Sequence, residues 1–266
     1  MGLASQMTRW DVEFCEQLAS QGFWVIRFDN RDIGRSTKIE EAGPPNLMAI
    51  VGAVMYGKEL NPPYSLQDMA ADAIGLLDAL DIESAHVMGA SMGGMIAQII
   101  ATEYPERVRT LTSIMSSTNN PDLPGPSSEA QTVLLSPPSP SREKYIEDSV
   151  KAWKVLNGPV FPIDEDLVRE KAGNDFDRSY YPDGSARQLM AILAVGDRTQ
   201  KLGEVKTPTL VIHGDADPLV PVECGKATAE AIVGSKLLII EGMGHSIPVE
   251  VAPRIIDAIS EHAKKA

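Results

Sequence analysis

Residues 89–93 read Gly89-Ala90-Ser91-Met92-Gly93 and are the most informative stretch of this chain. They follow a strand-like run at residues 85–88 and open a helix-like run at residues 92–100. A strand that turns this abruptly into a helix needs residues without bulk, and Gly89 and Gly93 meet that need. Gly-x-Ser-x-Gly in this setting is typical of a nucleophile elbow, which raises a serine hydroxyl above a sheet. We therefore expect Ser91 to be a nucleophile.

The bulk composition limits the class of protein. A length of 266 residues with 43% hydrophobic content suits one large α/β domain with an inserted subdomain. A net charge of −13 argues against nucleic acid and membrane partners. Cys15 and Cys224 are too few for a disulfide framework or a metal site, so a reducing compartment is expected. With no secretory leader pattern, we expect a cytoplasmic protein.

Apolar periodicity predicts strands separated by helices. Strands are expected at residues 23–28, 85–88, 109–115, 209–213 and 236–240. Helices are expected at residues 8–20 and 65–80, opened by Thr8 with Asp11 and by Ser65 with Asp68, and from Pro248 to about residue 263. This alternation predicts a mostly parallel sheet with helices on both faces, the α/β class.

Residues 119–198 break this rhythm. They contain no apolar strand pattern, and residues 121–140 hold six prolines. About 80 structureless residues inside a compact domain would be improbable. We therefore predict an inserted helical cap at 119–198, set in a core made of residues 1–118 and 199–266.

A serine nucleophile needs a base to take its proton. Among the four histidines, His86 begins a strand, His213 ends one and His262 lies in a polar tail, so each is expected to be structural or solvated. His245 lies in a glycine-rich loop just past the last predicted strand, at the sheet edge where active sites of such folds gather. His245 is therefore the candidate base.

The base in turn needs a carboxylate to orient it. The turn after residues 209–213 offers Asp215 and Asp217. Asp217 precedes a proline that restrains the backbone, so we favour it. Asp215 stays the alternative, and the residue not used is expected to serve the turn itself. The order Ser91, Asp217, His245 is the order described for α/β-hydrolases.

The developing charge on a substrate oxygen needs two hydrogen-bond donors. The amide of Met92, at the start of the elbow helix, is one candidate because unpaired N–H groups and the helix dipole favour an anion there. The amide of Leu3, in the loop at residues 1–6, is the second candidate. The alternative for Leu3 is a frayed segment with no such role.

Five stretches together carry a resemblance to a known family. They are residues 1–3, 28–36 (Phe-Asp-Asn-Arg-Asp-Ile-Gly-Arg-Ser), 89–94, 213–218 (His-Gly-Asp-Ala-Asp-Pro) and 242–245 (Gly-Met-Gly-His). The chain resembles α/β-hydrolase-fold serine esterases, nearest to the aclacinomycin methylesterase-like group with a helical cap. The resemblance implies Ser91 as nucleophile, Asp217 as acid, His245 as base, the Leu3 and Met92 amides as oxyanion hole, and no cofactor.

The resemblance also marks two departures. Asp32 stands where many relatives have glycine, which we expect to affect the turn at residues 29–36 rather than the chemistry. Relatives carry three strands ahead of the oxyanion loop, so the N-terminal strands are expected to be missing here. We expect either an altered sheet, in which residues 23–28 pair directly with the elbow strand, or a homo-oligomer that completes the sheet, because unpaired buried backbone groups are costly.

These residues predict hydrolysis of small-molecule carboxylic esters through an acyl-enzyme, without a metal or organic cofactor. Perhydrolysis of the cofactor-free haloperoxidase type and lactone opening use the same residues and stay open as alternatives. So does a truncated hydrolase shell with little activity, or one that only binds its ligand.

Overall fold

The computed structural model describes residues 1–265, apart from the side chains of residues 47, 54 and 55. Four strands form one parallel sheet in the order β1-β2-β3-β4. The strands are β1 Ala85–Ala90, β2 Val108–Ile114, β3 Thr209–Gly214 and β4 Lys236–Ile240. The elbow strand β1 therefore lies at one edge of the sheet and β4 at the other.

Eleven α-helices occur within the described residues. They are α1 Val12–Ser20, α2 Leu47–Met55, α3 Leu66–Ala79, α4 Met92–Glu103, α5 Ser128–Leu134, α6 Arg142–Leu156, α7 Glu165–Ser179, α8 Pro182–Ala194, α9 Thr199–Leu202, α10 Val222–Ala231 and α11 Ala252–Lys264. Three short 3₁₀ helices lie at Met7–Arg9, Glu40–Ala42 and Pro105–Arg107. Within this range no helix combines the length and apolar character that crossing a bilayer requires.

Helices cover both faces of the sheet, as the sequence predicts. On one face, apolar residues of α1 and α11 pack against Ile114, Ile212 and Ile240. On the other face, α4 and α9 share a second cluster with Leu111. Residues 111 and 114 of β2 point to opposite faces because side chains alternate along a strand. Since β3 is buried along its whole length, the core lies on either side of it.

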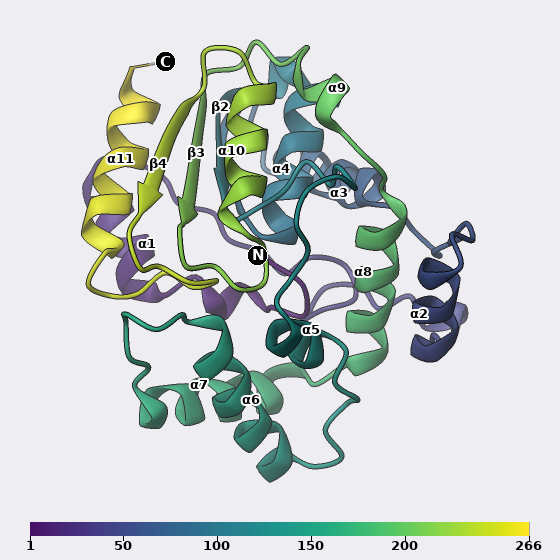
Figure 1. The fold of residues 1–266 in the computed structure, drawn as a ribbon. Helices are drawn as coiled ribbons and strands as arrows, with labels where there is room; N and C mark the ends of the chain where they lie inside the picture. The colour runs from purple at the N-terminus through teal and green to yellow at the C-terminus, as the bar shows by residue number, and fades with distance from the viewer. Residues whose placement is uncertain (266) are drawn as a thin grey trace.

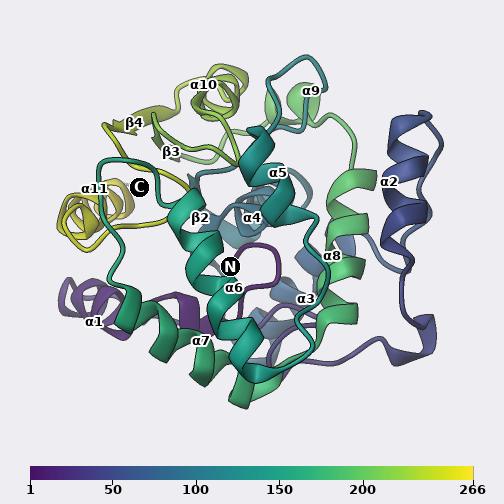
Figure 2. The same cartoon turned by 60° about the horizontal axis from the view of Figure 1, so that its bottom comes forward.

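The chain between β2 and β3 is helical. We call residues 119–198 the insertion. It contains the helices α5 to α8 and, within the described residues, no strand. The strands β3 and β4 point toward α5, α6 and α7, which lie across the carboxyl end of the sheet (Figures 1 and 2). That these residues form a separate cap domain stays a prediction.

The predicted strand at residues 23–28 is wrong. This segment has no strand conformation, and β1 pairs only with β2 within residues 1–265. Trp24 is 75% exposed, and Ile26 is also exposed. Apolar alternation favours a strand only where a neighbouring strand accepts its hydrogen bonds, and this segment has none. The sheet of the described residues has four strands, and the expected direct pairing of residues 23–28 with β1 does not occur.

Two predicted helix starts are also wrong. The first helix begins at Val12. Thr8 does not cap this helix, because its hydroxyl donates to the Asp175 carboxylate at 2.7 Å. The closing helix begins at Ala252, so Pro253 rather than Pro248 occupies its first turn. The Ser65 and Asp68 capping box at α3 is confirmed, with both reciprocal hydrogen bonds present.

Candidate active site

The candidate nucleophile lies at the tight turn between β1 and α4. Ser91 has φ 56° and ψ −123°, a conformation that L residues rarely adopt. A side chain at position 89 would meet the Gly93 carbonyl oxygen at 1.9 Å, which explains the glycine there. The Ser91 N–H donates to Ile114 O at 2.9 Å, and Ser116 Oγ donates to Ser91 O at 2.9 Å. The strained turn is therefore held from β2 and from the loop after it.

The structure brings Asp217 and His245 together. His245 Nδ1 lies 2.7 Å from Asp217 Oδ2, and both side chains are almost completely buried. Asp217 Oδ1 accepts hydrogen bonds from the Leu219 and Val220 amides, each at 2.9 Å. The carboxylate is thus fixed by its own turn and can orient the imidazole by accepting its Nδ1–H.

Ser91, Asp217 and His245 follow β1, β3 and β4. The strands are parallel, so their carboxyl ends lie at the same end of the sheet. Within residues 1–265 no hydrogen bond joins Ser91 Oγ to His245. Contacts between nucleophile and base are often loose before substrate binds. The arrangement places an oriented histidine and a strained serine at the same end of the sheet.

Asp215 serves the structure of the loops. Its Oδ1 accepts from the Gly242 N–H at 2.6 Å, which ties the loop after β3 to the loop that carries His245. The His245 N–H in turn donates to Leu156 O at 2.6 Å, at the end of α6. The loop of the candidate base is therefore held by the core and by the insertion.

His213 lies beside the acid rather than in the site itself. It is fully buried, and its Nε2 donates to Val220 O at 2.7 Å and lies 3.6 Å from Asp217 Oδ2. Burial lowers the pKa of His213, so the ring is neutral at pH 7. This agrees with its predicted structural role, although the sequence did not indicate its closeness to Asp217.

The loop with the candidate oxyanion amide lies directly against Ser91. A methyl group at position 2 would sit 3.0 Å from Ser91 Cβ and 3.4 Å from its Oγ. Residues 2–5 form a turn in which the Ser5 N–H donates to Gly2 O at 3.3 Å. Because the N–H and C=O of a trans peptide point in opposite directions, the Leu3 N–H points out of this turn. Within the described chain, neither the Leu3 nor the Met92 N–H has a hydrogen-bond acceptor.

Asp32 has a role that the sequence did not indicate. Its φ is 68°, and its buried carboxylate forms a two-point ion pair with Arg187 of α8 at 2.7 and 3.0 Å. Burial acts to raise the pKa of Asp32, but hydrogen bonds from Arg187 and the Ile39 amide outweigh it and lower that pKa. The departure from glycine therefore affects the turn, as expected, and also fastens the insertion to it. A buried-charge argument could have indicated that Asp32 needs a positively charged partner, since an unpaired buried carboxylate is very costly, but it does not say which residue.

Other polar contacts fasten the insertion in the same region. Arg178 Nη2 pairs with Asp29 at 2.7 Å, and Arg9 pairs with Asp175 at 2.9 Å. Asp29 also accepts from the amides of Met7 and Arg35. The two residues of each ion pair are more than a hundred residues apart along the chain, so no local pattern indicates these pairs.

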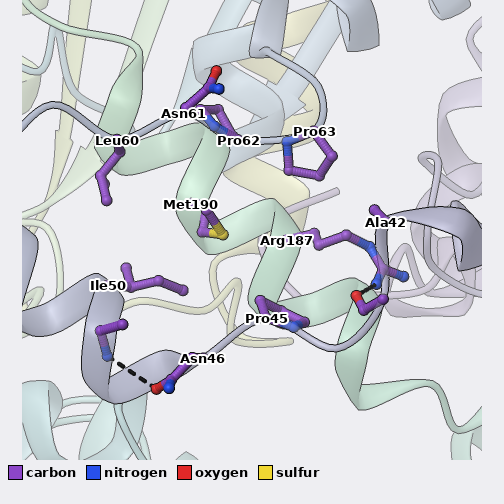
Figure 3. Close-up of a pocket in the computed structure, with 12 residues that line it drawn as sticks. Ala42, Pro45, Asn46, Ile50, Leu60, Asn61, Pro62, Pro63, Arg187 and Met190 are labelled. Atoms are coloured by element: carbon purple, nitrogen blue, oxygen red, sulfur yellow. Dashed lines mark hydrogen bonds between the residues drawn. The ribbon is translucent and has the colours of Figure 1, made fainter.

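A pocket of about 440 Å³ lies apart from these residues (Figure 3). It is bounded by α2, by residues 60–63 and by α8, where Met190 and Arg187 reach it. Ser91, Asp217 and His245 do not line it. Arg187 has its charge paired with Asp32 and donates to Gly43 O at 2.7 Å, so the pocket offers no free charge from this residue.

The fold and this arrangement define an α/β hydrolase. A family model described as "alpha/beta hydrolase fold" matches residues 2–251, so the chain belongs to that family. Among its relatives, it is 31% identical to the rhodomycin D methylesterase of Streptomyces sp. (strain C5), over 97% of this chain and 87% of that protein. It is also 31% identical to a 2-hydroxy-6-oxononadienedioate/2-hydroxy-6-oxononatrienedioate hydrolase of Cupriavidus pinatubonensis, over 86% of this chain and 72% of that protein.

Solved structures agree on the fold. A meta-cleavage product hydrolase of Pseudomonas fluorescens IP01 superposes with a TM-score of 0.74 at 22% identity, covering 99% of this chain and 88% of that one. A thermophilic esterase of Thermogutta terrifontis superposes with a TM-score of 0.70 at 26% identity, covering 98% and 86%. The resemblance expected from the sequence motifs is therefore confirmed at the level of family and fold.

Proposed function

We propose that this protein hydrolyses carboxylic esters of small molecules, with Ser91 as nucleophile, His245 as base and Asp217 as the residue that orients the base. The observation that carries the proposal is the buried 2.7 Å contact between Asp217 and His245, at the carboxyl end of the sheet, where the strained Ser91 also lies. A nucleophile, a base and an orienting carboxylate are the parts that acyl transfer needs.

In the proposed reaction, Ser91 Oγ attacks the ester carbonyl while His245 Nε2 takes its proton. The proton then passes to the leaving alcohol, and the acyl group stays on Ser91. A water molecule, deprotonated by the same histidine, attacks the acyl-enzyme; the bond to Ser91 Oγ breaks, the histidine returns the proton to Ser91 Oγ, and the acid leaves. In both steps the Leu3 and Met92 amides donate to the oxygen that becomes negatively charged.

Methyl esters are the first substrates to test, because two rhodomycin D methylesterases are among the relatives at 31% and 30% identity. Lactone opening and perhydrolysis use the same three residues and are the alternatives. A panel of methyl esters, lactones and hydrogen peroxide with a short acid distinguishes them by the product formed. The proposal expects the highest kcat/KM for an open-chain ester.

The test of the triad compares the unchanged chain with Ser91→Ala on p-nitrophenyl acetate. A burst of p-nitrophenol equal to the enzyme concentration is expected only with Ser91 present. Mass spectrometry after fluorophosphonate treatment should place the adduct on Ser91. Equal rates for the two proteins would refute the esterase proposal and leave a shell that only binds.

We further propose a cytoplasmic protein that pairs with a second copy along the edge of β1. Both cysteines, Cys15 and Cys224, are free thiols, which suits a reducing compartment. An edge strand with unpaired backbone groups favours pairing with another chain. Light scattering at micromolar concentration tests the pairing through the molecular mass, and a monomeric mass would refute it.

A further inference from the structure

The loop at residues 2–6, which we call the oxyanion loop, is held by the insertion. Its Ala4 N–H donates to Gln188 Oε1 of α8 at 3.1 Å. Its Gln6 Nε2 donates to Asp175 O at 2.6 Å and to Ser179 O at 3.1 Å, both at α7. Two separate helices of the insertion thus contact a loop that lies against the candidate nucleophile.

Gln188 is placed to control the conformation of this loop. It is completely buried, and its Nε2 donates to Arg31 O at 2.9 Å while its Oε1 accepts from Ala4. The side-chain amide therefore joins the oxyanion loop to the turn that contains Asp32. Because both ends of the amide are used, it cannot rotate without losing a buried hydrogen bond.

The bond from Ala4 matters because the turn is strained. Ala4 has φ 55°, in the left-handed region that L residues rarely adopt. Ala4 is also exposed, so packing of its methyl group does not hold it there. Two hydrogen bonds hold the Leu3–Ala4 peptide in this orientation: Ala4 N–H donates to Gln188, and Ser5 Oγ donates to Leu3 O at 3.2 Å. Only the first reaches the insertion, and the preceding peptide carries the Leu3 N–H.

We propose that Gln188 is a positioning residue for the oxyanion hole: through Ala4 it fixes the direction of the Leu3 N–H toward the carbonyl oxygen of the ester bound at Ser91. This proposal rests on the proposed function, because an oxyanion forms only if Ser91 attacks an acyl group. It places part of the machinery for charge stabilisation under the control of the insertion.

Removal of Gln188 should leave the rest of α8 in place. The neighbouring Arg187 keeps its two-point ion pair with Asp32, and Leu189 remains buried. Gln188→Met keeps the length and volume of the side chain and removes both polar groups. Gln200→Met, at an exposed glutamine of α9, makes the same chemical change away from the loop.

The experiment measures kcat, KM and the inhibition constant of a trifluoromethyl ketone, which adds to the serine as a tetrahedral oxyanion. Rates are divided by the concentration of active sites titrated with a fluorophosphonate. A misplaced donor lowers transition-state stabilisation rather than substrate binding, so Gln188→Met should lower kcat about tenfold or more with KM nearly unchanged. The ketone should bind more weakly by the same factor, whereas Gln200→Met should match the unchanged chain.

The outcomes separate this proposal from the proposed function. Ester hydrolysis that is independent of Ser91 would refute the proposed function. Hydrolysis that depends on Ser91, with kcat and ketone affinity of Gln188→Met within twofold of the unchanged chain, would refute the role of Gln188 alone. A loss of active sites with unchanged constants per site would show that Gln188 is merely structural.

Hydrogen exchange gives a second measurement that needs no variant. The Ala4 amide belongs to an exposed residue and should nevertheless exchange at least about tenfold more slowly than a free amide, because its bond to Gln188 must open first. Exchange of Ala4 at the rate of an unprotected amide would overturn the proposal even if Gln188→Met failed to fold.

Discussion

Arg187→Met should destabilise the fold far more than the loss of an ordinary ion pair. The Arg187 and Asp32 side chains are 1% and 0% exposed, and they meet through two hydrogen bonds. Without the guanidinium, the carboxylate keeps the Ile39 amide at 2.7 Å but loses its ion-pair partner. Breaking one side of such a buried pair costs about 3–5 kcal/mol.

A double-mutant cycle tests whether the pair itself causes this loss. Asp32→Asn removes the charge and tolerates the positive φ, since asparagine adopts that region readily. If the two residues stabilise each other, the double variant should lose less than the sum of the single losses, by about 2 kcal/mol. Urea unfolding followed by tryptophan fluorescence measures each value, with a fall in midpoint of about 1 M for 3 kcal/mol at a slope of about 3 kcal/mol/M.

Arg142→Met is the control within the same insertion. Its pair with Asp177 is exposed, at 42% and 55% of the two side chains, so its loss should be much smaller than that of the Arg187 pair, because water screens exposed charges. Equal losses for Arg142→Met and Arg187→Met, or single losses that simply add, would refute the reasoning from burial.

Three further predictions follow from other contacts. Asp217→Asn should lower kcat about 10⁴-fold with little change in melting temperature. The asparagine side chain can no longer hold His245 in the tautomer whose Nε2 accepts the proton of Ser91. Steady-state kinetics and calorimetry measure the two quantities. Gly34→Ala should destabilise the fold, because the new methyl would lie 2.1 Å from Asp29 Cγ at a φ of 57°; an unchanged unfolding midpoint would contradict it. The free energy of unfolding should fall as pH drops below about 6.5, because burial lowers the pKa of His213 in the folded state, so the unfolded chain takes up a proton more readily. The loss should reach up to about 1.4 kcal/mol per pH unit. Urea titrations at pH 5 to 8 measure it, and His213→Asn should show a smaller dependence on pH than the unchanged chain.

The parts of the site that follow strands were predictable from the sequence. Turns after predicted strands place Ser91, Asp217 and His245 on one edge, because parallel strands share the direction of their carboxyl ends. The preference for Asp217 over Asp215 rested on the proline that follows Asp217. In the structure Asp217 contacts the imidazole, and Asp215 contacts the Gly242 amide. These predictions needed only short stretches of sequence and their order.

The parts that depend on distant partners were not predictable in this way. Residues 23–28 have the apolar character of a strand but no neighbour to pair with. Gln188 gives no local signal, because its partners Ala4 and Arg31 are 184 and 157 residues away. Asp32 did give a signal, as an acid where relatives have glycine, but its partner Arg187 could be found only in three dimensions.

The contacts of α8 also bear on protein engineering. In α/β hydrolases, exchanging one helical insertion for another is an attractive route to new specificity. Here such a graft at residues 119–198 would leave Asp32 buried without its counter-charge and Ala4 without its acceptor. A workable chimera must therefore import an arginine and a glutamine at adjacent positions of its own last helix. Otherwise it must exchange both the turn at residues 29–36 and the loop at residues 2–6 together with the insertion.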